Sequence, residues 1–160
     1  MGMEFYGNSY KGNDEPIFVG IPTFLKLPWL RSHEELKSVR PDVAIIGEPF
    51  DFGTTIRPGA RYGPRAIRAA STVPSPPYEH FNIETGVDPF GVFRTVDYGD
   101  VNVSPGDVVE SHRRMTDKVK EVLDIDGIPV MLGGDLSITF ANVRAFAKKY
   151  KNIGMIHIDT

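Results

Sequence analysis

Four short apolar runs recur along the chain, and polar or amphipathic stretches separate them. Each run contains β-branched residues and is bounded by Gly, Pro or polar residues, which is typical of buried strands. We therefore predict strands near four ranges: Val43–Ile46, Val92–Val96, Pro129–Leu132 and Gly154–Ile158.

Helical signals occupy several of the stretches between these runs. Pro64 stands where the first turn of a helix tolerates proline, so a helix is expected over 65–70. Asp107 is expected to cap a second helix, because apolar residues follow it at helical spacing. These residues are Val108, Met115, Val119, Val122 and Leu123. A third helix is predicted from Ser137 to Tyr150. Its outer face is expected to carry Asn142, Arg144, Lys148 and Lys149.

Strands that alternate with helices predict a parallel sheet with helices on both faces. The stretch 73–90 contains four prolines and little periodicity, so we expect it to be a loop. A chain of 160 residues is long enough for one domain and not comfortably for two. We therefore expect one domain over residues 1–160.

Composition narrows the classes of function. Apolar residues make up 41% and charged residues 24%, as in ordinary globular proteins. The net charge of -3 argues against a nucleic-acid partner, which would need a basic face. No apolar run approaches the roughly 20 residues of a membrane-spanning helix, so we expect no membrane partner. The absence of cysteine excludes disulfides and thiolate metal sites, and it fits a cytoplasmic location.

Polar clusters follow three of the predicted strands. They are Asp51 with its loop, Gly133-Gly134-Asp135, and His157-Ile158-Asp159. In an open parallel sheet, ligands bind beyond the carboxyl ends of the strands, and carboxylate oxygens there suit Mn²⁺ or Mg²⁺. Two other interpretations stay open at this point. Such an Asp can simply cap a helix or shape a turn, and a Gly-Gly pair before a helix can cradle an anion.

Four segments match the sequence motifs of one enzyme family. The segment from Gly47 to Arg68 resembles the agmatinase loop G-x-P-x-D-x-G-T-x-x-R-P-G-A-R-x-G-P-x-A-I-R. Asp97–Val101 resembles D-x-G-D-V, Gly133–Ser137 resembles G-G-D-H-S, and His157–Thr160 resembles the opening of H-I-D-A-H-x-D. The order and separations also agree. The chain is therefore identified as similar to the N-terminal part of an agmatinase-like ureohydrolase of the arginase/agmatinase superfamily.

This resemblance implies a three-layer α/β/α fold with a mainly parallel sheet and a binuclear Mn²⁺ site at the strand ends. It implies a hydrolase that cleaves a guanidine or amidine C–N bond. A hydroxide shared by two metal ions attacks the guanidinium carbon, and urea and an amine are released. The implied partners are a small guanidino substrate and further copies of the chain, in a trimer or hexamer.

The resemblance also assigns roles to individual residues. Asp159 matches a metal-bridging aspartate of the family. Asp135 matches an aspartate beside a metal ligand, where it supports the site from outside the metal's own ligand set. His157 lies two residues before Asp159, on the same face of the predicted strand, and we expect it to be hydrogen-bonded rather than metal-bound. We expect packing and subunit contact from the arginines of the long loop and the helix after it: Arg57, Arg61, Arg65 and Arg68.

Two departures from the family pattern limit what the chain can do alone. Position 136 is Leu136 where the motif has a metal-ligating histidine, and leucine has no donor atom. The sequence reaches Thr160 before the later ligands of the family, so we expect the domain to be incomplete at its C-terminal side and no catalytic residue within the chain. Two alternatives remain. One is a non-catalytic homologue that acts as a subunit or regulatory partner, favoured by Leu136. The other is a small phosphate-binding domain, which rests only on Gly133-Gly134.

Overall fold

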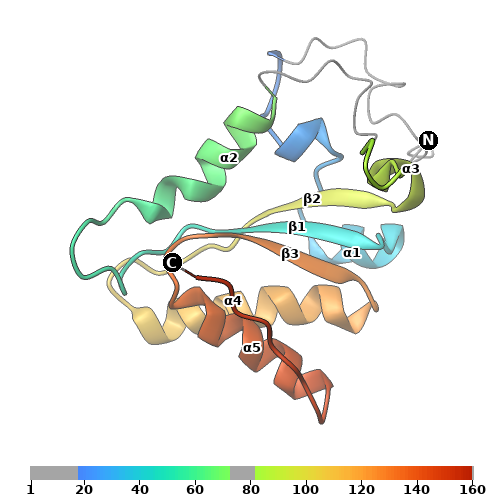
Figure 1. Cartoon of the computed structure of the whole chain (residues 1–160). Helices are drawn as coiled ribbons and strands as arrows, with labels where there is room; N and C mark the ends of the chain where they lie inside the picture. Colours follow the sequence, from blue (N-terminus) through green and yellow to red (C-terminus); the bar gives the residue numbers. More distant parts are fainter. Residues whose placement is uncertain (1–17, 73–81, 160) are drawn as a thin grey trace.

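Three parallel strands form the centre of the computed structural model, which describes residues 18–72 and 82–159 (Figure 1). The strands are β1 (Val43–Glu48), β2 (Thr95–Asp100) and β3 (Ile128–Gly133), in the order β2-β1-β3. β1 pairs in parallel with both neighbours. All three strands therefore point their carboxyl ends to the same edge of the sheet.

Helices connect and cover these strands. They are η1 (Phe24–Lys26), α1 (His33–Val39), η2 (Ala60–Tyr62), α2 (Gly63–Ser71), α3 (Pro89–Val92), α4 (Val108–Asp124) and α5 (Ile138–Lys149). Asp107 caps α4 as predicted, because its side chain accepts a hydrogen bond from the Glu110 amide at 2.9 Å. Pro64 lies in the first turn of α2, also as predicted.

The helices form two layers, one on each face of the sheet. α4 and α5 pack together beneath the sheet in Figure 1, and α2 lies above it. The main core lies on the α4/α5 side, where Ala44 and Ile46 of β1 meet Met115 and Val119 of α4 and Ala141 of α5. This arrangement confirms the predicted three-layer α/β/α fold.

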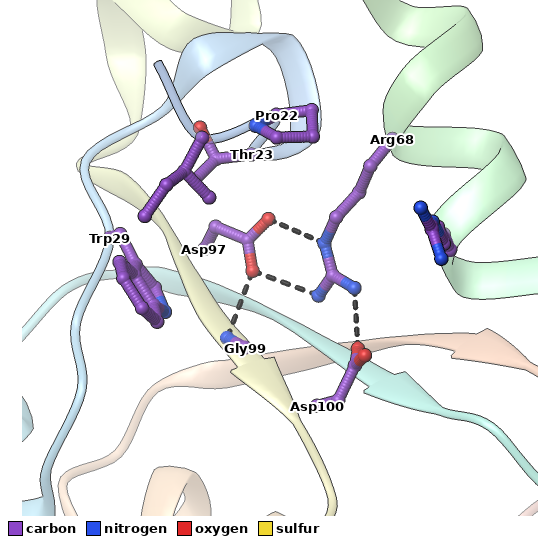
Figure 2. Close-up of a pocket in the computed structure, with 9 residues that line it drawn as sticks. Pro22, Thr23, Trp29, Arg68, Asp97, Gly99 and Asp100 are labelled. Atoms are coloured by element: carbon purple, nitrogen blue, oxygen red, sulfur yellow. Dashed lines mark hydrogen bonds and ion pairs between the residues drawn. The ribbon is translucent and has the colours of Figure 1, made fainter.

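A buried arginine joins the α2 layer to the sheet. Arg68 of α2 is 6% exposed, and its guanidinium donates to both carboxylate oxygens of Asp97 on β2, at 2.7 and 2.9 Å. It also donates to Asp100 at the end of β2, as Figure 2 shows. Packing and subunit contact were the roles predicted for Arg68; these contacts confirm packing, and subunit contact stays a prediction. The buried charge of Asp97 therefore depends on this helix for its neutralisation.

The second strand begins later than predicted. Val92 lies in α3 and not in a strand, because Asp88 caps this short helix and Pro89 begins it. The strand starts at Thr95. Of the predicted loop 73–90, residues 73–81 lie outside the described residues, and 82–88 form a turn closed by a bridge between Asn82 and Val87.

The predicted fourth strand is wrong in this structure. Residues 153–159 follow α5 as an extended segment that forms no strand, and their side chains are exposed, with Ile156 at 92%. A strand is defined by hydrogen bonds to a neighbouring strand, and β3 does not pair with this segment. An apolar pattern alone cannot supply that neighbour.

No helix in the described part of the chain is both long enough and apolar enough to cross a membrane.

Replacing Arg68 with methionine is expected to lower the free energy of unfolding by about 3 kcal/mol or more, because it leaves the Asp97 carboxylate buried without its cation. Arg65→Met is the matched control, since Arg65 is exposed on the same helix. Urea denaturation of both variants measures the difference. Equal loss of stability in the two variants would contradict a special role for the buried pair.

Candidate functional site

Asp51 organises the long loop that follows β1. Its buried carboxylate accepts hydrogen bonds from the backbone amides of Gly59 and Arg61, at 2.6 and 3.2 Å, and from Nε of Arg61 at 2.6 Å. The Arg61 side chain and these amides lower the pKa of Asp51 to about 2. The carboxylate therefore stays ionised, and it closes the loop over residues 51–61. Asp51 therefore shapes a turn, which is one of the two interpretations left open for an Asp after a strand. Arg61 packs within the same loop, as predicted.

Asp135 joins the loop after β3 to the loop after β1. One carboxylate oxygen accepts a hydrogen bond from the Gly53 amide at 2.6 Å, and the other accepts from the Ser137 amide at 2.9 Å and from the Ser137 hydroxyl. The backbone amide of Asp135 donates to the carbonyl of Phe50 at 2.8 Å. Two of the three polar clusters predicted from sequence thus lie together. The supporting role of Asp135 beside a metal ligand stays a prediction.

Gly134 lets these two loops approach closely. A Cβ at this position would lie 2.3 Å from the Phe50 carbonyl oxygen and 2.7 Å from the Glu48 carbonyl oxygen, so only glycine fits. Two amides in the loop before α5 already have acceptors, since Asp135 donates to Phe50 and Ser137 donates to Asp135. These contacts argue against the phosphate-binding interpretation of the Gly-Gly pair.

An imidazole that the sequence analysis did not single out faces the same loop. His112 of α4 lies with Nε2 at 3.5 Å from the Ser137 hydroxyl oxygen and packs against the rings of Phe50 and Phe140. Burial, followed by the charge of Arg144, lowers the pKa of His112. Its distance from Ser137 in sequence left no local signal of this contact.

A buried polar pair lies beneath the two loops. Glu48, the last residue of β1, is 0% exposed, and Oε2 accepts a hydrogen bond from Nδ2 of Asn142 at 3.0 Å. Burial raises the pKa of Glu48 to about 7, against a smaller lowering by the Asn142 hydrogen bond. Asn142 was predicted on the outer face of its helix, and that prediction is wrong. It lies four residues after Ile138 and three before Ala145, and this spacing is the signal that places it inward.

The third predicted cluster lies on the exposed segment after α5. His157 Nε2 is 3.7 Å from a carboxylate oxygen of Asp159, so the two side chains do lie close together. They do so without the strand on which the sequence analysis placed them. The metal-ligand role of Asp159 and the hydrogen-bonded role of His157 stay predictions.

The described residues do not fit a manganese site by themselves. No group of three or more His, Cys, Asp or Glu side chains among residues 18–72 and 82–159 is placed to hold a metal ion. Leu136, at the position where the motif resemblance predicts a histidine ligand, is 59% exposed and offers no donor atom. Both oxygens of Asp135 already accept hydrogen bonds within the loops.

A pocket of about 220 Å³ lies beside the carboxyl end of β2 (Figure 2). Trp29, Pro22 and Thr23 form one wall, and Arg68 with Asp97 and Asp100 forms another. Arg65 also lines it, so two guanidinium groups balance two carboxylates. That balance leaves little net attraction for a guanidinium cation.

Comparison with known proteins gives consistent results. A sequence model described as the arginase family matches residues 41–160. The chain is 38% identical over 148 residues to a guanidinobutyrase from Pseudomonas aeruginosa, covering 92% of this chain and 44% of that protein. Among solved structures, it is similar to a hypothetical agmatinase from Burkholderia thailandensis, with a TM-score of 0.74, 31% identity, and coverage of 92% of this chain and 43% of that one.

Another similar solved structure contains a metal. A formiminoglutamase from Trypanosoma cruzi, solved with Mn²⁺, matches with a TM-score of 0.62 and 28% identity, over 81% of this chain and 41% of that one. The chain thus spans less than half of the length of each of these three proteins.

Arg61→Ala is expected to raise the pKa of Asp51 from about 2 toward the ordinary value near 3.8, because it removes the guanidinium that lowers it most. Because folding lowers the pKa of Asp51, its ionised carboxylate stabilises the fold at pH values above 3.8. That stabilisation is lost as the pH falls toward 2. The variant should lose this pH dependence, and the Gly59 amide should exchange faster with solvent.

Arg57→Ala is the matched control, since Arg57 is an exposed arginine of the same loop and its loss changes the net charge equally. NMR titration of the Asp51 carboxyl carbon and amide hydrogen exchange measure both effects. If the two variants behave alike, the closing of the loop by Asp51 and Arg61 is refuted.

Proposed function

The chain belongs to the arginase family, and we propose that it functions in a metal-dependent hydrolase that cleaves a guanidine or amidine C–N bond. Hydrolysis of a guanidine consumes one water molecule and releases urea and an amine; hydrolysis of an amidine releases an amide and an amine. The observation that carries this proposal is the junction of the Asp51 and Asp135 loops at the carboxyl edge of the sheet. This edge is where ligands bind in open α/β sheets, and the loops carry the motifs shared with ureohydrolases.

The proposed metal is manganese, supported by the relative crystallised with Mn²⁺. A bound manganese pair would lower the pKa of a water molecule and so supply a nucleophile near neutral pH. Because the described residues do not fit a metal site, we derive no catalytic step through it. The part that we propose for this chain is limited to Asp159 as one ligand, and to Asp135 and Asp51 as residues that hold the surrounding loops in place.

The proposed substrate is a small guanidino compound, supported by the relative named guanidinobutyrase. We further propose a homo-oligomer, a trimer or hexamer, with no nucleic-acid or membrane partner. Arg57 and Arg65 are exposed and therefore accessible for subunit contact. The proposed location is the cytoplasm, which fits a chain without cysteine.

A second candidate function rests on Leu136. An exposed apolar side chain at a metal-ligand position is unfavourable for a hydrolase and acceptable in a non-catalytic subunit or regulatory partner. The two candidates differ in whether the protein, in the longest form that its gene encodes, binds two metal ions and releases urea.

Leu136→His, made in that longest form, is expected to strengthen binding of the first metal ion by at least about tenfold, because it adds an imidazole donor to the site. Guanidine hydrolysis should rise with it. Leu136→Met is the matched control, since it keeps an apolar side chain of similar size. Metal titration and an assay of urea release measure the two effects, and no change in either would falsify the view that position 136 is a lost ligand site.

The 160-residue chain by itself is expected to bind fewer than two manganese ions and to release no urea. The reason is that it offers only Asp159 as a proposed ligand, on an exposed segment with no neighbouring strand. We also expect it to be stable only with further polypeptide packed against residues 153–158. Elemental analysis, a urea assay and thermal melting test these expectations. A soluble, cooperatively melting monomer with guanidine hydrolase activity would show that they are wrong.

A further inference from the structure

The buried pair between β1 and α5 has an unusual hydrogen-bond pattern. Asn142 Nδ2 donates to Oε2 of Glu48 at 3.0 Å. The other oxygen of each side chain, Oε1 of Glu48 and Oδ1 of Asn142, is buried and has no hydrogen-bond partner among the described residues. Both of these atoms are acceptors when Glu48 is ionised.

Two unpaired acceptors in a dry interior are costly, and a buried unpaired charge is more so. An ionised Glu48 would carry both penalties, because its carboxylate has a single hydrogen bond from a neutral amide. A proton on Oε1 removes the charge and supplies the one donor that the pair lacks.

We propose that Glu48 is a neutral carboxylic acid that donates its proton from Oε1 to Oδ1 of Asn142. The acid and the amide then form a ring of two hydrogen bonds that fastens α5 to the carboxyl end of β1. The raised pKa of Glu48, about 7, agrees with this state.

The charged and titratable groups on the neighbouring elements have other partners. They are His112 of α4, Arg144 of α5, Asp51 and Asp135 of the two loops, and Asp100 of β2. Burial and the Asn142 hydrogen bond are the causes of the pKa shift of Glu48. The pKa of Glu48 is therefore set first by burial and then by the Asn142 hydrogen bond, rather than by a nearby ion pair.

The ring acts on the site through the loops above it. The Glu48 carbonyl lies so close to Gly134 that a Cβ there would be 2.7 Å away, and Asn142 follows Ser137 by little more than one helical turn. Fixing β1 against α5 thus fixes the loop in which Asp135 bonds to Ser137 and Gly53. Glu48 is a positioning residue for the proposed site, and this inference concerns its protonation and loop geometry. It can therefore fail while the hydrolase proposal stands, and the reverse also holds.

The first experiment is an NMR titration between pH 4 and 9 of the protein in the longest form that its gene encodes, with glutamate labelled at the carboxyl carbon. One carboxyl carbon should titrate near pH 7, and its signal should be missing from Glu48→Gln. The amides of Gly53 and Ser137 should shift over the same pH range in the wild type and stay unchanged in Glu48→Gln. Titration of Glu48 near its ordinary value of 4.5, or loop amides that ignore the transition, would overturn the proposal.

The second experiment is the urea midpoint as a function of pH. A folded-state pKa raised from 4.5 to about 7 means that the native state binds more protons between these values, so stability falls as the pH rises through this range and levels off above it. Glu48→Gln keeps the ring, because its amide can donate to Oδ1, and it cannot ionise. Relative to this variant, the wild type should lose stability across that range.

The exposed substitution Glu84→Gln is the matched control and should follow the wild type. Glu48→Leu, which cannot donate, should be less stable than Glu48→Gln at every pH. Parallel pH profiles for the wild type and Glu48→Gln would refute the proposal. If neither Glu48 variant folds, the carboxyl titration of the wild type still decides the question.

Discussion

The parallel pairing of β1 with both of its neighbours is the constraint on which the rest of the structure depends. Since all three strands run the same way, the loops that follow β1 and β3 meet at one edge of the sheet. Their approach is close enough that Gly134 has no room for a side chain. Asp135 then bonds across the junction to the Gly53 amide, which makes the two loops one unit.

This edge also concentrates acidic side chains in places that water reaches poorly. Three of these side chains have different partners for their carboxyl groups. Asp51 is ionised and surrounded by an arginine and two backbone amides, and Asp97 pairs with the buried Arg68. Glu48 has neither a cation nor several donors, and by our proposal it keeps its proton. The contacts of Asp97 and Glu48 join elements distant in sequence, whereas those of Asp51 close a single loop; in each case the contacts of the acidic side chain also hold the surrounding backbone in place.

Both loops lie within the region that matches the arginase family. Leu136, in the loop after β3, has no donor atom that could bind a metal. The contacts of Asp51 lie within the loop after β1, and Asp135 joins that loop to the loop after β3; none of these contacts needs a metal to form. A chain can therefore keep the geometry of the strand ends without a complete set of metal ligands. This is why the catalytic and the non-catalytic interpretations share the same fold and differ only in what binds at its edge.

The sequence by itself determined the class of fold and the family. β-branched runs, the Asp107 cap and the position of Pro64 are local signals, and the elements they predict lie where expected except for the start of β2 and the predicted fourth strand. It could not determine the segment 153–158, because an apolar run becomes a strand only beside another strand. The sequence prediction also places Asn142 wrongly, because a polar side chain faces inward where it meets a buried polar partner such as Glu48. Only the tertiary structure brought Asn142 to Glu48, His112 to Ser137, and Asp135 to Gly53. These contacts join residues 25 to 94 positions apart, and their partners are fixed by the crossing of helices and strands rather than by neighbours in the chain.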